Sequence, residues 1–303
     1  MKKGILDGKI LTNRAESRPL GWVSAYEIPE NIKITRDELR ARFDEAGVDP
    51  SLMPPEIRPV DAFRRATREA EITGLKGPDN TRRNVLVREV VSSKDGVIRH
   101  LVDEIVDANN VRLSYGTVAQ IRFDRSSSDL TSQSWGSDAL IVDTLAKIAG
   151  LYDEYRRYYQ GDHIRRTVSG ILHGMSPTFM KSALYFVPEK YQEDLFKLRA
   201  LCHLVSEECR FIVMPLYDAH DARAMIAENF QNQVKRHILS LSEQIRGEAP
   251  ISETAAARII EETKTLLAQV NEYEQVLRTN LSYLEADVEI VRAQIRAVLE
   301  KIA

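Results

Sequence analysis

The chain has 303 residues, a formal net charge of −3 at pH 7 and 43% hydrophobic residues. This length and composition predict a globular protein with a buried core and room for two structural units. The nearly balanced charge excludes a global electrostatic footprint for nucleic acid or an anionic membrane. No apolar run reaches the roughly 18 residues that a membrane span needs.

The first residues, MKKGILDGKIL, contain two lysines but only short apolar runs, so no signal peptide is expected. The two cysteines, Cys202 and Cys209, fall on a predicted helix about 10 Å apart, too far for a disulfide. We therefore expect a soluble, cytoplasmic protein.

Residues 1–83 are predicted to form an N-terminal segment with short strands and two short helices. Asp7-Gly8 suits a hairpin turn between two short apolar runs. Thr35 and Glu38 have the spacing of a capping box and predict the start of the first helix. Pro59 suits the first turn of the second helix.

Residues 84–218 are predicted to form an α+β core that begins with an antiparallel meander. We expect its strands at 84–91, 97–106 and 111–123, separated by hairpin turns. In the third strand, one face is expected to hold Val111, Leu113, Tyr115, Thr117, Ala119, Ile121 and Phe123. Such alternation is typical of a strand with one face on a core and one in water. The serine-rich segment 125–136 has no periodicity and is predicted to be a mobile loop.

Residues 219–303 are predicted to form an antiparallel helical hairpin. Apolar residues recur through 252–302 at spacings of three and four, the pattern of a coiled coil, apart from two successive fours at Tyr273-Leu277-Leu281. We expect one uninterrupted second helix of about 50 residues, longer than the first by about 20. Its unmatched apolar seam is expected to pack on the body or on another chain. The candidate interface residues are Leu281, Leu284, Val288, Val291, Ile295 and Val298.

A tyrosine- and arginine-rich segment at 152–166 is a candidate nucleic-acid site, because aromatic rings stack on bases and guanidinium groups bind phosphates. Its candidate contact residues are Tyr155, Arg156, Arg157, Tyr159, His163, Arg165 and Arg166. Alternatively, the tyrosines form the rim of an ordinary amphipathic helix. Four strand arginines would extend the surface if they share one face of the sheet: Arg88, Arg99, Arg112 and Arg122.

Motifs for catalysis or cofactor binding are not found. Cys202, His203, Cys209 and His220 lack the spacing of a zinc site, and the cysteines are expected to be small buried apolar residues. No phosphate-binding loop, His-Glu-x-x-His or Gly-x-Ser-x-Gly motif occurs. We therefore expect no catalytic residue, metal or cofactor that a motif would reveal.

Taken together, these patterns predict an α+β fold: an antiparallel β-meander with packed helices, followed by a long, coiled-coil-like C-terminal helical hairpin. The favoured function is a non-enzymatic assembly protein that self-associates or docks a protein partner through its long C-terminal helix. The alternative is a nucleic-acid-binding protein, with a preference for single strands, that uses residues 152–166. An enzyme whose site is assembled from scattered residues is the third hypothesis.

Overall fold

The computed structural model describes residues 19–181, 183–246, 253–279, 281, 284, 289–290 and 293. The helices are α2 (Arg36–Ala46), α3 (Pro59–Glu69), α4 (Ala139–Arg157), α5 (Gly161–His173), α6 (Gln192–Val205), α7 (His220–Arg246) and α8 (Glu253–Leu277). The strands are β1 (Pro19–Glu27), β2 (Lys33–Ile34), β3 (Ile72–Lys76), β4 (Arg82–Ser92), β5 (Gly96–Val106), β6 (Arg112–Asp124), β7 (Leu130–Ser134), β8 (Tyr159–Gln160), β9 (Thr178–Phe179), β10 (Tyr185–Pro188) and β11 (Arg210–Tyr217). Three short 3₁₀ turns are η1 (Pro50–Leu52), η2 (Pro78–Asn80) and η3 (Glu189–Tyr191).

The combination of antiparallel sheets and separate helices confirms the predicted α+β class. None of the helices in the described residues has the length and hydropathy of a membrane-spanning helix. The hairpin predicted at Asp7-Gly8 lies outside the described residues.

The chain divides into two compact units. Residues 30–41 and 53–164 form one, here called the five-stranded unit, and residues 1–29, 42–52 and 165–303 form the other, here called the four-stranded unit. The segments expected at 1–83, 84–218 and 219–303 cut across this division. Helix α3 of the first segment and the meander of the second share a single core.

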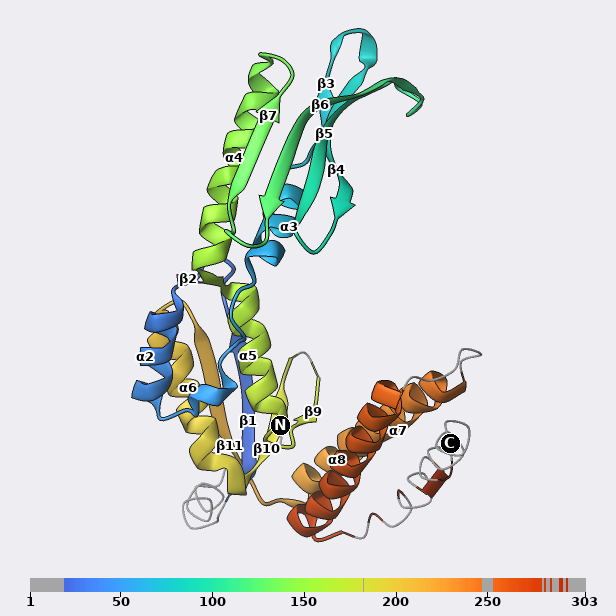
Figure 1. The fold of residues 1–303 in the computed structure, drawn as a ribbon. Coiled ribbons are helices and arrows are strands. Elements are labelled where there is room, and N and C mark those ends of the chain that lie inside the picture. Colours follow the sequence, from blue (N-terminus) through green and yellow to red (C-terminus); the bar gives the residue numbers. More distant parts are fainter. Residues whose placement is uncertain are drawn as a thin grey trace, which may run out of the picture. The chain divides into compact units, whose positions relative to one another are not determined.

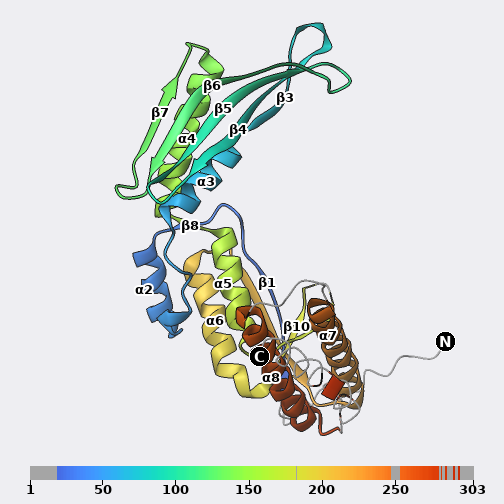
Figure 2. The same cartoon turned by 45° about the vertical axis from the view of Figure 1, so that its right-hand side comes forward.

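The five-stranded unit is an antiparallel sheet of order β3-β4-β5-β6-β7 with α3 and α4 packed on one face (Figure 1). Phe63 on α3 stacks on Phe123 of β6, with ring centroids 5.4 Å apart. Tyr152 on α4 meets the same Phe123 ring edge-on at 6.0 Å. This aromatic cluster joins both helices to the sheet, which is visibly curved in Figure 2.

Local sequence explains where the elements of this unit begin. The capping box predicted before α2 is present: Glu38 Oε2 accepts from the backbone N–H of Thr35 at 2.9 Å. Pro59 is the first residue of α3, as expected. Asp138 caps α4 by accepting from the Leu140 N–H at 2.9 Å. The predicted meander is also confirmed, because β4, β5 and β6 pair in antiparallel order.

The prediction of a mobile loop at 125–136 is wrong, because β7 occupies Leu130–Ser134 and forms the fifth strand. A tight turn leads into it: Asp124 Oδ1 accepts from the N–H groups of Ser126 and Ser127. Leu130 then pairs with Phe123 across the sheet. Polar residues fit an edge strand in which only one face packs on a core, so a serine-rich composition did not preclude pairing.

The four-stranded unit is built on an antiparallel sheet of order β11-β1-β10-β9. The central strand β1 pairs with both β10 and β11. At Gly21 a side chain would not fit, since a Cβ atom would lie 2.3 Å from the carbonyl oxygen of Val187. Helix α6 packs on the sheet through Phe196, whose ring meets Trp22 edge-on at 5.1 Å.

Helices α7 and α8 pack against one another in antiparallel order and against β10. The Phe230 ring of α7 stacks on Tyr273 of α8 at 4.1 Å, and Tyr273 meets Phe186 of β10 at 6.3 Å. At the other end, Leu241 of α7 packs against Ile259 of α8. The apolar seam therefore faces a core within the same chain.

The prediction of an uninterrupted helix from 252 to 302 is wrong. Helix α8 ends at Leu277, and Arg278 has a positive φ of 48°. The Leu277 carbonyl accepts from Arg223 Nη1 at 3.0 Å, which caps the helix end from α7. Helices α7 and α8 thus have 27 and 25 residues, and the expected overshoot of the second helix disappears.

Replacement of Phe230 by Ala tests the packing of α7 and α8. The side chain is fully buried, so we expect Phe230→Ala to lower the free energy of unfolding by about 3–5 kcal/mol. Met225→Ala, on the same helix but exposed, should change it by less than about 0.5 kcal/mol. Urea denaturation followed by circular dichroism measures both. Equal effects would contradict the packing described for Phe230.

Candidate nucleic-acid interface

The face on which β6 places its side chains changes at Val118. Leu101 of β5 pairs with Ala119, but the next residue, Val102, pairs with Thr117, so Val118 is an extra residue in β6. Because side chains alternate with a period of two, this β-bulge reverses the faces of the residues before it. A second extra residue, Leu113, reverses them again, because Ile105 pairs with Ser114 but Val106 pairs with Arg112. Ala119, Ile121 and Phe123 face the helices, as predicted. Tyr115 and Thr117, expected on the core face, instead lie on the opposite face.

We call this opposite side of the sheet, away from α3 and α4, the open face. Strand register places on it Arg88, Ile98, His100, Glu104, Arg112, Tyr115, Thr117, Gln120, Arg122, Thr131 and Gln133. The contact between the rings of Trp135 and His100 adds Trp135 to this face. Arg88, His100, Gln120 and Gln133 form one row across four strands, since each pairs with the next. At its centre Leu86 pairs with Val102, and both are buried.

An exposed tryptophan lies at the edge of this face. The Trp135 side chain, which follows β7, is 53% exposed. Its ring meets His100 edge-on, with centroids 5.9 Å apart and an interplanar angle of 89°. The backbone N–H of Trp135 donates to the carbonyl oxygen of Val118, the bulge residue, at 3.0 Å. The bulge therefore anchors the backbone at Trp135 and also brings Tyr115 to the same face.

An arginine guanidinium group lies over the ring of a second aromatic residue on the open face. Arg112 lies over the Tyr115 ring, 4.3 Å from its centroid, and donates to Glu104 at 2.8 Å. Asn84 donates to the other Glu104 oxygen at 2.9 Å. These two hydrogen bonds hold the pKa of Glu104 below its ordinary value, so this carboxylate is ionised and paired at neutral pH.

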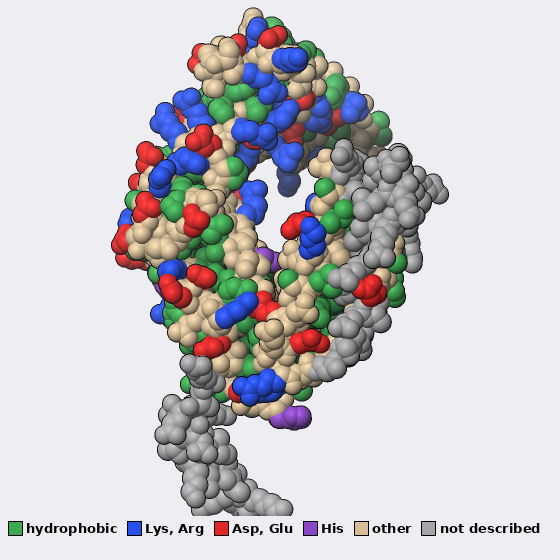
Figure 3. Space-filling model, turned by 60° about the horizontal axis from the view of Figure 1, so that its bottom comes forward, with side chains coloured by type: hydrophobic (Ala, Val, Ile, Leu, Met, Phe, Trp, Pro, Cys, Tyr) green, Lys and Arg blue, Asp and Glu red, His purple; other side chains and the backbone are tan. Residues whose placement is uncertain are grey.

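Two further arginines belong to the open face. Arg122 is exposed and lies opposite Thr131, whereas Arg88 is exposed and pairs with Glu71 at 3.2 Å. Figure 3 shows Lys and Arg side chains gathered in the upper part of the view, among acidic and hydrophobic ones. Exposed guanidinium groups beside exposed rings are the groups that single-stranded nucleic acids need, for phosphates and bases respectively.

Arg99, the fourth strand arginine, points toward the helices. It donates to Thr67 Oγ1 and to the carbonyl oxygen of Arg64 on α3, and it pairs with Glu89 at 2.8 Å. These contacts make Arg99 a structural residue, so only three of the four strand arginines share one face.

The segment 152–166 does not form a single surface. Its candidate residues fall on α4, β8 and α5, and the division into two units separates Arg165 and Arg166 from the others. Tyr155 is buried and its hydroxyl donates to Glu69. Tyr159 is buried and donates to the carbonyl oxygen of Pro55 at 3.0 Å. Neither ring is free to stack on a base, which agrees with the alternative interpretation as core residues.

The charged members of that segment are also engaged in contacts. Arg156 pairs with Asp153 at 2.6 Å, and His163 Nδ1 accepts from the backbone N–H of Gln160 at 3.2 Å. Arg165 Nε donates to the carbonyl oxygen of Ile28 at 3.3 Å. Arg157 and Arg166 are exposed. Nucleic-acid binding by this segment stays a prediction that nothing in these contacts favours.

The cysteines are packing residues in this structure. Cys202 and Cys209 are both buried, and burial raises the pKa of each thiol, that of Cys209 to about 11. Among the described residues, no three His, Cys, Asp or Glu side chains lie close enough together to hold a metal ion.

Sequence reasoning missed Trp135 and His100 because the two residues are 35 positions apart and Trp135 was assigned to a loop. One signal was available: Trp135 follows a short polar run that suits an edge strand. The bulge at Val118 has no comparable signal, since Gly116, two residues earlier, was the only break in the strand pattern.

Comparison with known proteins shows to which family this chain belongs. No curated protein and no solved structure matches this chain. A family model matches residues 19–303, which include both units and nearly the whole chain. The chain therefore belongs to DUF6744, a family of unknown function.

Proposed function

We propose that this protein binds single-stranded nucleic acid on the open face of its five-stranded sheet. The observation that carries the proposal is the half-exposed Trp135 ring, supported edge-on by His100 on the same face as Arg88 and Arg122. An exposed tryptophan offers a large, rigid aromatic face on which a base can stack. On a sheet, such rings form platforms for unstacked bases.

The geometry favours single strands over duplexes. A base can lie flat on Trp135 or Tyr115 only after it has left its own stack, which a single strand permits at low cost. The row of His100, Gln120 and Gln133 offers side-chain donors and acceptors to base edges along the same line. Phosphates would be bound by Arg88, Arg112 and Arg122.

Removal of the Trp135 ring should weaken binding of a fluorescein-labelled 15-nucleotide single strand. We expect Trp135→Ala to raise Kd by about 5- to 150-fold, the loss typical of one stacked base. Trp135→Phe, which retains a ring, should lose less. Fluorescence anisotropy on nuclease-treated protein measures Kd, with the matching duplex as competitor. Unchanged affinity in Trp135→Ala, or tighter binding of the duplex, would rule out this site.

Salt dependence tests the phosphate contacts. Each phosphate contact with a single strand contributes about −0.7 to the slope of log K against log salt. The double variant Arg88→Ala/Arg122→Ala should therefore flatten the slope by about 1.4.

A control double variant, Arg40→Ala/Arg42→Ala on α2, removes the same charge from one exposed and one half-buried position outside the sheet. It should leave the slope unchanged. If both double variants flatten the slope equally, the arginines act only through net charge and the open face is not the phosphate site.

As a second candidate, we propose that the C-terminal region mediates association between copies of this chain, as a coiled-coil-like hairpin could. Leu281 and Leu284, two of the expected interface residues, are buried in a core with Phe186 and Tyr273 of the same chain. They are therefore not available to a partner. Val288, Val291, Ile295 and Val298 lie outside the described residues. Leu239 at 62% and Ile290 at 54% exposure support the proposal instead.

Light scattering after size exclusion tests this association. We expect wild type to have a multiple of 34.4 kDa and Leu239→Asp/Ile290→Asp to be monomeric with an unchanged circular dichroism spectrum. Charged residues at these exposed positions cost little in the monomer but oppose burial at an interface. A wild-type monomer would end the proposal.

A further inference from the structure

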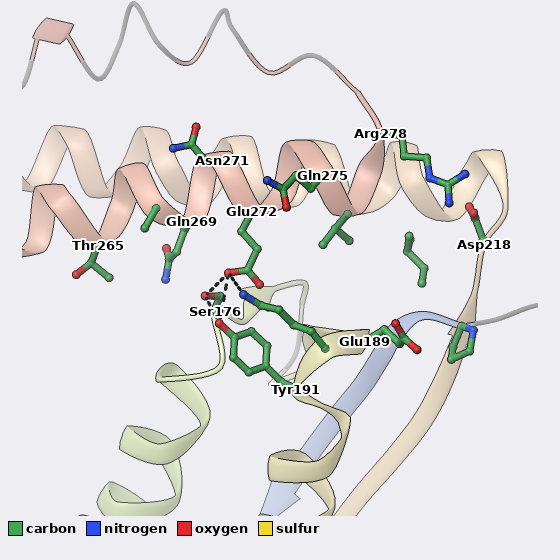
Figure 4. Close-up of a pocket in the computed structure, with 15 residues that line it drawn as sticks. Ser176, Glu189, Tyr191, Asp218, Thr265, Gln269, Asn271, Glu272, Gln275 and Arg278 are labelled. Carbon is green, nitrogen blue, oxygen red and sulfur yellow. Dashed lines mark hydrogen bonds and ion pairs between the residues drawn. The ribbon is translucent and has the colours of Figure 1, made fainter.

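The four-stranded unit contains a pocket of about 810 Å³ between α8, the start of β1 and the η3 turn. Most of the residues that line it have polar or charged side chains. Helix α8 contributes Thr265, Gln269, Asn271, Glu272 and Gln275. In Figure 4 the Glu272 side chain reaches from α8 toward Ser176 and Tyr191, and Thr265 and Gln269 lie along the same helix. Three polar groups thus converge from separate parts of the chain, as expected for a site assembled from scattered residues.

The two oxygens of Glu272 have different surroundings. Oε2 accepts from Ser176 Oγ at 3.0 Å and from Tyr191 OH at 3.3 Å, and it lies 3.0 Å from the Lys190 ammonium. Oε1 is buried and has no hydrogen-bond partner among the described residues. A carboxylate oxygen can accept two hydrogen bonds, and a buried one that accepts none is rare in native proteins. The described residues therefore supply too few donors for the acceptor oxygens of Glu272.

The charged residues that line the pocket decide which kind of hydrogen-bond donor a ligand can offer to Glu272. Lys190 is held in its charged form, since hydrogen bonds to Glu272 and Tyr191 outweigh the effect of burial and raise its pKa. Asp218 is paired with Arg223. The remaining lining charges are those of Glu189 and Arg278, beside the Glu272–Lys190 pair. No anion site is built around Glu272, because its neighbours are a hydroxyl pair and a single lysine that it already neutralises.

We propose that this pocket binds a small polar ligand through a primary ammonium group. An ammonium group has three donors and no acceptor, which suits a carboxylate flanked by hydroxyl oxygens and side-chain amides. A ligand ammonium group can replace that of Lys190 at Oε2, and a partial rotation about the terminal bond of Glu272 can bring Oε1, which is buried in this structure, into contact with the same group. The Lys190 side chain is 56% exposed and can move aside, because it is anchored mainly by Glu272. Lys190 therefore acts as an internal competitor of the ligand.

Isothermal titration calorimetry with putrescine tests the proposal on nuclease-treated, full-length protein. Putrescine should bind with Kd below about 1 mM, whereas 1,4-butanediol, its neutral counterpart of equal length, should not. Glu272→Gln keeps the shape of the side chain but removes its charge, and it should weaken binding at least about tenfold. Glu261→Gln, an exposed position on the same helix, is the matched control and should bind like wild type.

Lys190→Met provides a test with the opposite sign. Removal of the competing ammonium should tighten putrescine binding several-fold. Because the Lys190 side chain is 56% exposed, its replacement should not unfold the protein, so a change in affinity can be attributed to the pocket. Equal binding of butanediol, equal affinities of Glu272→Gln and Glu261→Gln, or weaker binding in Lys190→Met would each overturn the proposal. These outcomes are independent of the sheet interface, because the pocket residues all belong to the four-stranded unit.

Discussion

Side chains on a β-strand alternate between its two faces, and a single extra residue therefore reassigns every position on one side of it. In β6 that residue is Val118, and its effect extends as far as a second extra residue, Leu113. Ala119, Ile121 and Phe123 remain against α3 and α4, while Tyr115 and Thr117 turn to the open face. The Val118 carbonyl also accepts from the Trp135 N–H. One irregularity thus secures the core on one side and assembles the aromatic groups on the other.

The same sheet separates its arginines by role. Arg99 faces the helices and joins β5 to α3 through Thr67, with its charge balanced by Glu89. Arg88 and Arg122 face the other way and remain exposed. Residue type alone does not distinguish these roles. The partner that each guanidinium meets is decided by strand register, and register is a property of paired strands.

The four-stranded unit depends on Tyr273. Its ring stacks on Phe230 of α7 and meets Phe186 of β10, and its hydroxyl donates to the carbonyl oxygen of Ser176 at 2.8 Å. This single side chain connects the α7–α8 hairpin, the sheet and the segment that carries Ser176. The neighbouring Glu272 is consequently held against Ser176 and Tyr191. The packing residue and the proposed binding residue are adjacent in sequence and both contact Ser176, Tyr273 at its carbonyl oxygen and Glu272 at its hydroxyl group.

Local sequence determined those features that depend on residues a few positions apart, such as the starts of helices and the turns between strands. The capping box at Thr35 and Glu38, the proline at the start of α3 and the hairpin turns between the strands of the meander all act over a few residues, so these elements could be predicted. The spacing irregularity at Tyr273-Leu277-Leu281 also indicated a change in the last helix, although not that the helix would end there.

Tertiary structure decided everything that depends on distant partners. Arg223 caps α8 at Leu277, 54 positions away, and the next leucines return to the core instead of extending an exposed seam. Tyr155 and Tyr159 find partners for their hydroxyls at Glu69 and Pro55, which removes them from the surface. Trp135 and His100 meet only because β7 pairs with β6 and β6 with β5. Hydrophobic periodicity tells which residues will be buried together in one element, but it contains no information about which distant element will cover them.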